Sequence, residues 1–444
     1  MVTKRTEELL KWDAEHMLHC LGFVGQNLGF SPFEEAQGIM IKDTEGKEYI
    51  DLHSQLTNVN LGHNRKDIAE VIKAQIDKMM FTATLRGWAN VPSIEYGQKL
   101  AQVVPKGLGN FLFTMTGADA VDCAFKIANL YYKVKGERRY KILSLFNSYH
   151  GTLRGTGGAS GVLKGACGEC PPCGDHIHIP NYFCYRCPLH KEYPGCGIEC
   201  AEFLDYVIEN EGKDNILCFI AEPEQGAGGF ISPPAGYFPR VREICSKHGV
   251  VFIADEVMTG FGRTGKMFAV EHWDVTPDIM TMSKGIVSGY LPFGAVAISD
   301  EILNTLRGQF FALGSTECGN PICCAVASKV LDIYREEHIV EHGAEVGKQV
   351  RERLEREFLP LPHVGSVSGL GLMLGLDIVV DKKTKAIPGP EVTNLVIRRA
   401  LEQGLYLRMV GNRIGFSPPL VITQEEANEA LDRLYPIVAE LKLS

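Results

Sequence analysis

The middle of the chain alternates short apolar runs with segments of helical periodicity, and this alternation is the feature that most constrains the fold. The apolar runs are residues 110–115, 141–146, 216–222, 250–257, 279–283 and 294–299. The segments of helical periodicity include residues 118–133, 237–248 and 321–336. Strands that alternate with helices predict a mainly parallel α/β sheet. Runs such as VVFIA and ILCFIA are apolar throughout, so these strands are expected to be buried on both faces.

The two ends of the chain carry different patterns. In residues 1–80 a helical segment precedes residues 40–42 and 48–52, which flank the turn DTEG and predict a hairpin. Residues 323–444 contain two candidate strands and two candidate helices, namely residues 370–380, 391–403, 414–418 and 424–441. We therefore expect a large α/β domain over residues 81–322 and a small α+β domain built from residues 1–80 and 323–444. Residues 164–200 are rich in Gly, Pro and Cys and are expected to form a long surface insert.

Charge and hydropathy argue against several classes of partner. The net charge is −9 and the chain has no long Lys/Arg run, so neither nucleic acid nor an anionic membrane is an expected partner. The N-terminal residues have no apolar core typical of a secretory signal. No apolar stretch approaches the roughly 18–20 residues that span a bilayer. These features predict a soluble, cytoplasmic protein.

Two charged residues close buried apolar runs. Asp255 follows VVFIA, at the strand end where α/β sheets bind ligands, and its carboxylate would suit a pyridinium N–H. Lys284 follows IMTMS, and burial there would favour the neutral amine that forms a Schiff base. Taken singly, Asp255 could equally cap a loop, and Lys284 is more simply a surface lysine beyond a strand.

Two further segments indicate phosphate and ring binding. Gly117 and Ala118 open a long helix after a strand, where backbone N–H groups and the helix dipole favour a phosphate. Tyr149, in NSYHG, follows another strand and could stack on a planar ligand. A Gly-Ala turn and a half-buried tyrosine are each common without such a role.

Taken together, these segments resemble one enzyme family. TGADA, SYHG, EPEQGAGG, ADEVMTGFGRTG, MSKG and STECGNP occur in this order over nearly the whole chain. The sequence resembles the class III aminotransferases of fold type I, which use pyridoxal 5′-phosphate. The resemblance implies a large domain with a central, mainly parallel seven-stranded sheet and a small α+β domain formed by both chain ends.

The resemblance also implies the residues that hold the cofactor. Lys284 is similar to the lysine that carries the cofactor as a Schiff base and shuttles a proton, and Asp255 to the residue that pairs with the pyridine nitrogen. Gly117 and Ala118 resemble the phosphate-binding turn, and Tyr149 resembles the ring stacked on the cofactor. Thr316 resembles a threonine that reaches the phosphate of the neighbouring subunit, which implies a homodimer or a dimer of dimers.

Substrate residues are less directly matched. Glu222 resembles an acid that pairs with a mobile arginine when no substrate carboxylate is bound, and Arg413 is the candidate for that arginine. Family members often place the arginine directly before F-x-P-P-L, where this chain has Gly415. Arg413 lies two residues earlier and so on the same face of a strand. In addition, Met258 stands where many members have a glutamine that meets the cofactor O3′.

Half of the 14 cysteines fall in the insert, as Cys167, Cys170, Cys173, Cys184, Cys187, Cys196 and Cys200. His176, His178 and His190 lie in the same segment. Paired C-x-x-C units resemble a zinc knuckle, so a structural metal is one hypothesis. The alternative is a loop stabilised by burial of soft side chains.

The leading functional hypothesis is transamination of an ω-amino acid, aminosulfonate or amine, with pyruvate or 2-oxoglutarate as acceptor. The segment SQLTNVNLGH (54–63) is similar to one in taurine and other ω-amino-acid transaminases. The alternative is an amino-acid racemase or epimerase of the same fold, with the same cofactor residues. A non-catalytic binding protein is a third hypothesis, against which the presence of both Lys284 and Asp255 argues.

Overall fold

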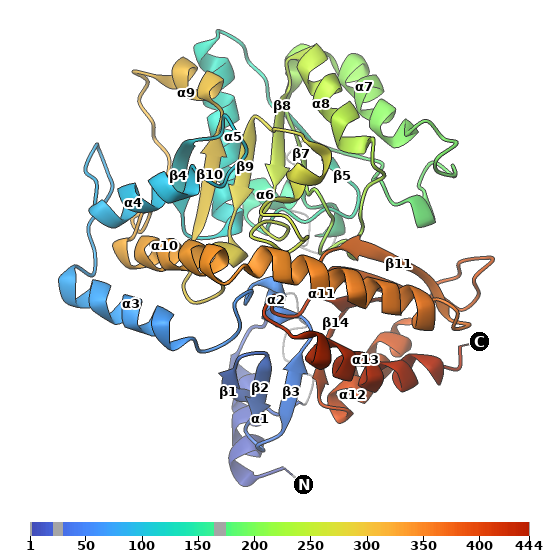
Figure 1. The fold of residues 1–444 in the computed structure, drawn as a ribbon. Helices are drawn as coiled ribbons and strands as arrows, with labels where there is room; N and C mark the ends of the chain where they lie inside the picture. The colour runs from blue at the N-terminus through green and yellow to red at the C-terminus, as the bar shows by residue number, and fades with distance from the viewer. Residues whose placement is uncertain (1, 21–29, 164–174, 444) are drawn as a thin grey trace.

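A seven-stranded sheet forms the centre of the protein in the computed structural model, which describes residues 2–20, 30–163 and 175–443 (Figure 1). From one edge to the other its strands are β4 (Asn110–Thr114), β10 (Gly294–Ile298), β9 (Ile279–Met282), β8 (Val251–Asp255), β7 (Ile216–Ala221), β5 (Lys141–Leu145) and β6 (His176–Ile179). Strand β10 runs antiparallel to both of its neighbours, and the remaining pairs are parallel. The predicted mainly parallel sheet is therefore confirmed.

Both faces of this sheet are covered. In β8 the side chains of Val251 and Ile253 pack with α5 (Gly117–Val134). Those of Phe252 and Ala254 pack in the core that contains α8 (Tyr237–His248). Alternate side chains point to opposite faces of a strand, so an all-apolar strand needs helices on both sides. The continuous apolar runs in the sequence therefore reflect burial of both faces of the sheet.

The helices from α3 to α11 match the predicted periodic segments where predictions were made. They are α3 (Lys66–Lys78), α4 (Val91–Leu100), α5, α6 (Arg154–Ala159), α7 (Glu199–Glu211), α8 (Tyr237–His248), α9 (Asp300–Leu306), α10 (Pro321–Glu336) and α11 (Ile339–Arg353). Side-chain caps set two of the starts. Thr116 accepts a hydrogen bond from the Asp119 N–H at α5, and Asn320 caps α10, whose first residue is a proline.

The two chain ends meet in one sheet. Strands β1 (Phe33–Gln37), β2 (Met40–Asp43) and β3 (Glu48–Asp51) form the predicted hairpin and an added strand, and β13 (Leu405–Tyr406) pairs parallel with β3. A further sheet has the order β11 (Val364–Leu370), β12 (Met373–Ile378), β15 (Arg413–Phe416) and β14 (Arg408–Val410). Helices α1 (Lys4–His16), α2 (Ser54–Thr57), α12 (Pro390–Glu402) and α13 (Gln424–Ala439) complete these regions. Segments hundreds of residues apart thus share a sheet below the large one (Figure 1).

The insert departs from the expected surface excursion. Residues 164–174 lie outside the described residues, but His176–Ile179 form β6, the edge strand of the large sheet, and Ile179 is buried. The strand is short and reads HIHI, so it lacks the apolar run by which the other strands were found. Among the described residues, no helix has both the length and the apolar composition needed to cross a bilayer.

Candidate functional site

A cavity of about 460 Å³ opens at the carboxyl ends of β7, β8 and β9. Its wall includes the predicted residues Gly117, Ala118, Tyr149, Glu222, Asp255 and Lys284. These side chains follow different strands or open α5, and they meet because parallel strands present their carboxyl ends at one edge of a sheet. The structure therefore brings six of the eight predicted site residues together.

Asp255, the last residue of β8, is buried and fully hydrogen-bonded. Its Oδ2 lies 2.6 Å from Nδ1 of His150, and its Oδ1 accepts hydrogen bonds from the Thr281 hydroxyl and the Val257 N–H, both at 3.1 Å. Bonds of this kind stabilise a buried carboxylate. His150 was not among the predicted site residues, although it stands in the SYHG motif, because its contact with Asp255 spans over a hundred residues.

Lys284 follows β9 and has a positive φ of 46°, a conformation that costs energy for a side chain other than glycine. Burial, helped by the nearby positive charge of Arg408, lowers the pKa of Lys284 to about 8, against the opposing effect of Asp255 and Glu222. With such a pKa about a tenth of the amine is neutral at pH 7, far more than for a lysine with the ordinary pKa of about 10.4. The amine is therefore able to act as a nucleophile and as a base.

The N-terminus of α5 lines the same cavity through Thr116, Gly117 and Ala118. A Cβ on Gly117 would lie 2.7 Å from Cγ1 of Val257, so only glycine allows α5 to begin this close to the loop after β8. Gly151 has φ +116°, and a Cβ there would lie 2.6 Å from Cβ of Ala118. The SYHG loop thus packs directly against the start of a long helix, whose free N–H groups attract anions.

Glu222 directly follows β7 and is buried in the cavity wall. Its two carboxylate oxygens accept hydrogen bonds from the N–H groups of Tyr149 at 2.9 Å and Gly226 at 3.0 Å. Burial raises the pKa of Glu222 to about 7, although the charge of His150 and these hydrogen bonds oppose the rise. Glu222 thereby fixes the backbone of Tyr149, whose ring lines the cavity.

Arg413 lies elsewhere. Its guanidinium forms a buried ion pair of 2.8 Å with Asp377, donates to the Gly229 carbonyl and to Ser368, and lies 4.9 Å from the ring centroid of Phe183. It is neither a solvated charge nor part of the cavity wall. Its bonds hold β15 against the loop after β7.

Arg408, on the neighbouring strand β14, is the arginine that lines the cavity. Within residues 2–20, 30–163 and 175–443, no carboxylate oxygen lies within 4.0 Å of its nitrogens. Gly415 pairs with Arg408 across the two strands, and a Cβ on Gly415 would lie 2.3 Å from the ring of Phe230. Phe230 thus explains why this chain has glycine before FSPPL. Sequence reasoning missed Arg408, because two arginines five positions apart look alike without the strand pairing.

The remaining predicted positions lie partly inside and partly outside the cavity. Met258 lines the cavity, and a Cβ on Gly226 would lie 1.9 Å from its sulfur, so the side chain fills the space beside EPEQG. Thr316 is exposed and does not line the cavity of its own chain.

Cys167, Cys170 and Cys173 lie outside the described residues. Of the remaining insert residues, Cys184, Cys187, Cys196 and Cys200 line a separate small cavity, and the three histidines do not.

Comparisons with known proteins identify the family. Residues 25–438 match the model of the aminotransferase class-III family. The chain belongs to the class III aminotransferases. Enzymes of this class use pyridoxal phosphate. The cavity fits that group, because a helix N-terminus, a buried carboxylate and a lysine with a lowered pKa line one space, and Gly117 leaves the helix start open.

Individual relatives of this aminotransferase cover nearly all of it. An adenosylmethionine-8-amino-7-oxononanoate aminotransferase of Methanocaldococcus jannaschii is 36% identical, over 98% of each chain. A leucine/methionine racemase of Thermococcus litoralis is 34% identical, over 92% of this chain and 90% of the other. The crystal structure of an (S)-enantioselective omega-transaminase from Thermomicrobium roseum superposes with a TM-score of 0.93 at 36% identity, over 99% of each chain. The expected fold type I architecture is thereby confirmed.

Proposed function

We propose that this aminotransferase moves the amino group of an ω-amino acid, aminosulfonate or amine to a 2-oxo acid, pyruvate or 2-oxoglutarate. The observation that carries the proposal is the approach of Lys284 and Asp255 to one cavity from neighbouring strand ends. The likeness to an omega-transaminase over the whole chain supports a donor whose amine is remote from a carboxylate.

The predicted residues on the cavity wall have the following proposed tasks. Pyridoxal phosphate, when bound, supplies an electron sink that makes the proton on the donor's amine-bearing carbon acidic. Lys284 holds the cofactor and then moves that proton. Asp255 keeps the ring nitrogen protonated, and His150 and Thr281 hold its carboxylate in place. The N-terminus of α5 at Gly117 and Ala118 binds the phosphate, and Tyr149 covers the ring.

Arg408 is the proposed anchor for the substrate carboxylate. It lines the cavity with no carboxylate of the described chain within 4.0 Å, and burial lowers its pKa. A guanidinium stays protonated in proteins. A guanidinium binds a carboxylate with two parallel hydrogen bonds. Arg413, held by Asp377, is instead a structural residue in this proposal.

Arg408→Ala is expected to raise the KM for a 2-oxo acid acceptor roughly ten- to a hundredfold, because a charge-assisted bond to its carboxylate is lost. Its thermal unfolding should change little. Arg413→Ala should instead lower the free energy of unfolding by about 3 kcal/mol, because a buried ion pair is broken. Steady-state kinetics and chemical denaturation of both variants measure the contrast. A higher acceptor KM in Arg413→Ala, with Arg408→Ala unaffected, would contradict the assignment.

A half-reaction distinguishes transamination from the racemisation suggested by the Thermococcus litoralis relative. Enzyme loaded with pyridoxal phosphate is mixed with single amines or amino acids and no 2-oxo acid. We expect about one equivalent of carbonyl product per chain from the preferred donor, because a transaminase stops after half of its cycle. Loss of optical activity of an amino acid without any carbonyl product would instead identify a racemase. Repeating the screen with pyruvate and with 2-oxoglutarate identifies the acceptor.

We also propose that the working enzyme is a homodimer or a dimer of dimers. Thr316 is exposed, and exposed apolar side chains such as Phe310, Trp88 and Met80 lie in the sequence segments before α4 and before Thr316. Large exposed apolar side chains are typical of interfaces between subunits. In such a dimer Thr316 reaches the phosphate site of the neighbouring subunit.

A further inference from the structure

Four cysteines that the proposed reaction does not use surround one small cavity. Cys184, Cys187, Cys196 and Cys200 line a space of about 20 Å³ beside the N-terminus of α7. A space of roughly 10–15 Å³ is enough to hold one water molecule, so this cavity has room for one ion. All four are free thiols, and the four side chains come from two segments that are separated by a loop.

The spacing of these cysteines is that of a metal site. Cys184-x2-Cys187 surrounds a single 3-10 turn, Cys184–Arg186, and Cys196-x3-Cys200 leads into α7. Two such pairs supply the four thiolates of structural zinc sites. Cys200 lies in the first turn of α7, where the helix dipole favours a thiolate.

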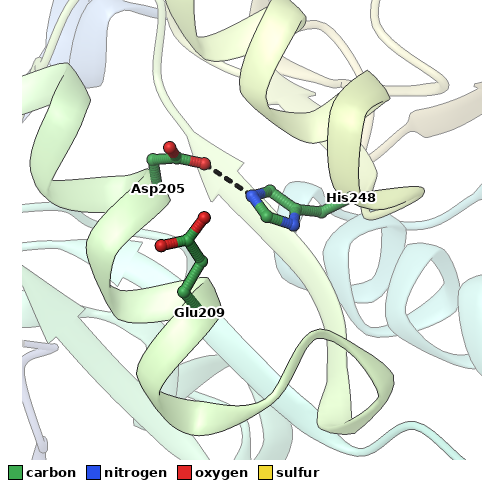
Figure 2. Close-up of side chains that lie close together, drawn as sticks. All are labelled: Asp205, Glu209 and His248. Carbon is green, nitrogen blue, oxygen red and sulfur yellow. Dashed lines mark hydrogen bonds and ion pairs between the residues drawn. The ribbon is translucent and has the colours of Figure 1, made fainter.

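The sulfur atoms are more widely spaced than in a formed zinc site. Among the described residues, the group of three potential ligands whose ligand atoms all lie within 4.8 Å of one another consists of Asp205, Glu209 and His248 (Figure 2). The four cysteines do not meet this criterion. The Lys247 ammonium bonds to both of those carboxylates, so their charge is already balanced. In a tetrahedral zinc site with bonds of about 2.3 Å, sulfur atoms lie roughly 3.8 Å apart. Rotation of a cysteine about its Cα–Cβ bond moves the sulfur by about 3 Å, and zinc binding requires these side chains to rotate towards one another.

We propose that Cys184, Cys187, Cys196 and Cys200 bind one Zn²⁺ as thiolates. The ion replaces the protons of the thiols, so binding weakens as the pH falls. The alternatives are disulfides among the four and buried thiols without metal.

The site would hold the segment that connects the large sheet with the sheet of β12. Tyr182 donates a hydrogen bond of 2.7 Å to the Glu222 carbonyl, behind the active cavity. Arg186, between the first two cysteines, pairs with Asp377 at 2.7 Å. Zinc at the four sulfurs fixes both contacts without touching the cofactor, so its role is structural.

Metal content tests the proposal. The holoenzyme, purified without chelators under reducing conditions, is expected to contain about one zinc per chain. After chelation, Co²⁺ should restore one bound metal with a thiolate-to-cobalt charge-transfer absorption. The variant Cys184→Ser with Cys187→Ser should lose both signals, and Cys20→Ser, which removes an exposed thiol far along the chain, should keep them.

Thiol mapping keeps the test decisive if the double variant does not fold. Zn²⁺ should protect the four cysteines of the wild-type enzyme from alkylation, and chelation should expose them, with Cys20 modified in both cases. Absence of zinc and of a cobalt signal overturns the proposal, and so does full metal retention in the double variant. Peptides joined by disulfides among the four cysteines in protein purified under reducing conditions overturn it as well.

Discussion

Replacing Lys284 with alanine is expected to lower kcat by a factor of about a thousand or more while the subunit stays folded. The amine is the only group on the cavity wall, among the described residues, that combines a lowered pKa of about 8 with the reach to act as nucleophile and proton carrier. Removing the amine would abolish both the covalent attachment of the cofactor and the proton transfer that we propose for Lys284. Steady-state assays with the preferred donor and acceptor measure the loss.

Two controls separate this chemical role from a structural one. Lys73→Ala, at an exposed position of α3, should leave kcat unchanged. Pyridoxal phosphate should still bind to Lys284→Ala, because the carboxylate and the helix N-terminus remain, but it should leave the variant on dialysis under conditions in which the wild-type enzyme retains it. Turnover within a few fold of wild-type would remove the central assignment.

Asp255→Asn is expected to lower kcat by about a hundredfold to a thousandfold, the range found when a preorganised electrostatic group is removed from an active site. The amide has nearly the same shape and can still accept hydrogen bonds from Thr281 and Val257, so the fold is retained. It lacks the charge that keeps a ring nitrogen protonated, so the electron sink is weakened. The loss should therefore fall on kcat more than on KM.

Asp77→Asn, an exposed change of the same kind in α3, is the matched control and should have no effect. His150→Gln should give a smaller decrease in kcat than Asp255→Asn, because His150 acts only through the carboxylate that it holds at 2.6 Å. A kcat for Asp255→Asn within about threefold of wild-type would show that the carboxylate does not serve the reaction.

The strands, the main helices and the positions of Asp255 and Lys284 at strand ends follow from the sequence. All-apolar runs predicted buried parallel strands, and Asp255 and Lys284 close two of them. Such strands present their carboxyl ends at one edge of the sheet, and this rule together with the resemblance to class III aminotransferases predicts that these two residues meet. The turn proposed to bind phosphate was predicted in a similar way, from a glycine at the junction of a strand and a long helix.

Tertiary structure decided the contacts that depend on pairing between distant segments. Arg408 and Arg413 lie on paired strands, and only the position of Asp377, 36 residues from Arg413, determines that Arg413 is held away from the cavity. The hydrogen bond between His150 and Asp255 is also a contact between segments far apart in the sequence, as is the convergence of the four cysteines on one cavity. Local periodicity in the sequence indicates which face of a helix or strand is buried. The residue that a buried side chain contacts is determined by the packing of the whole chain.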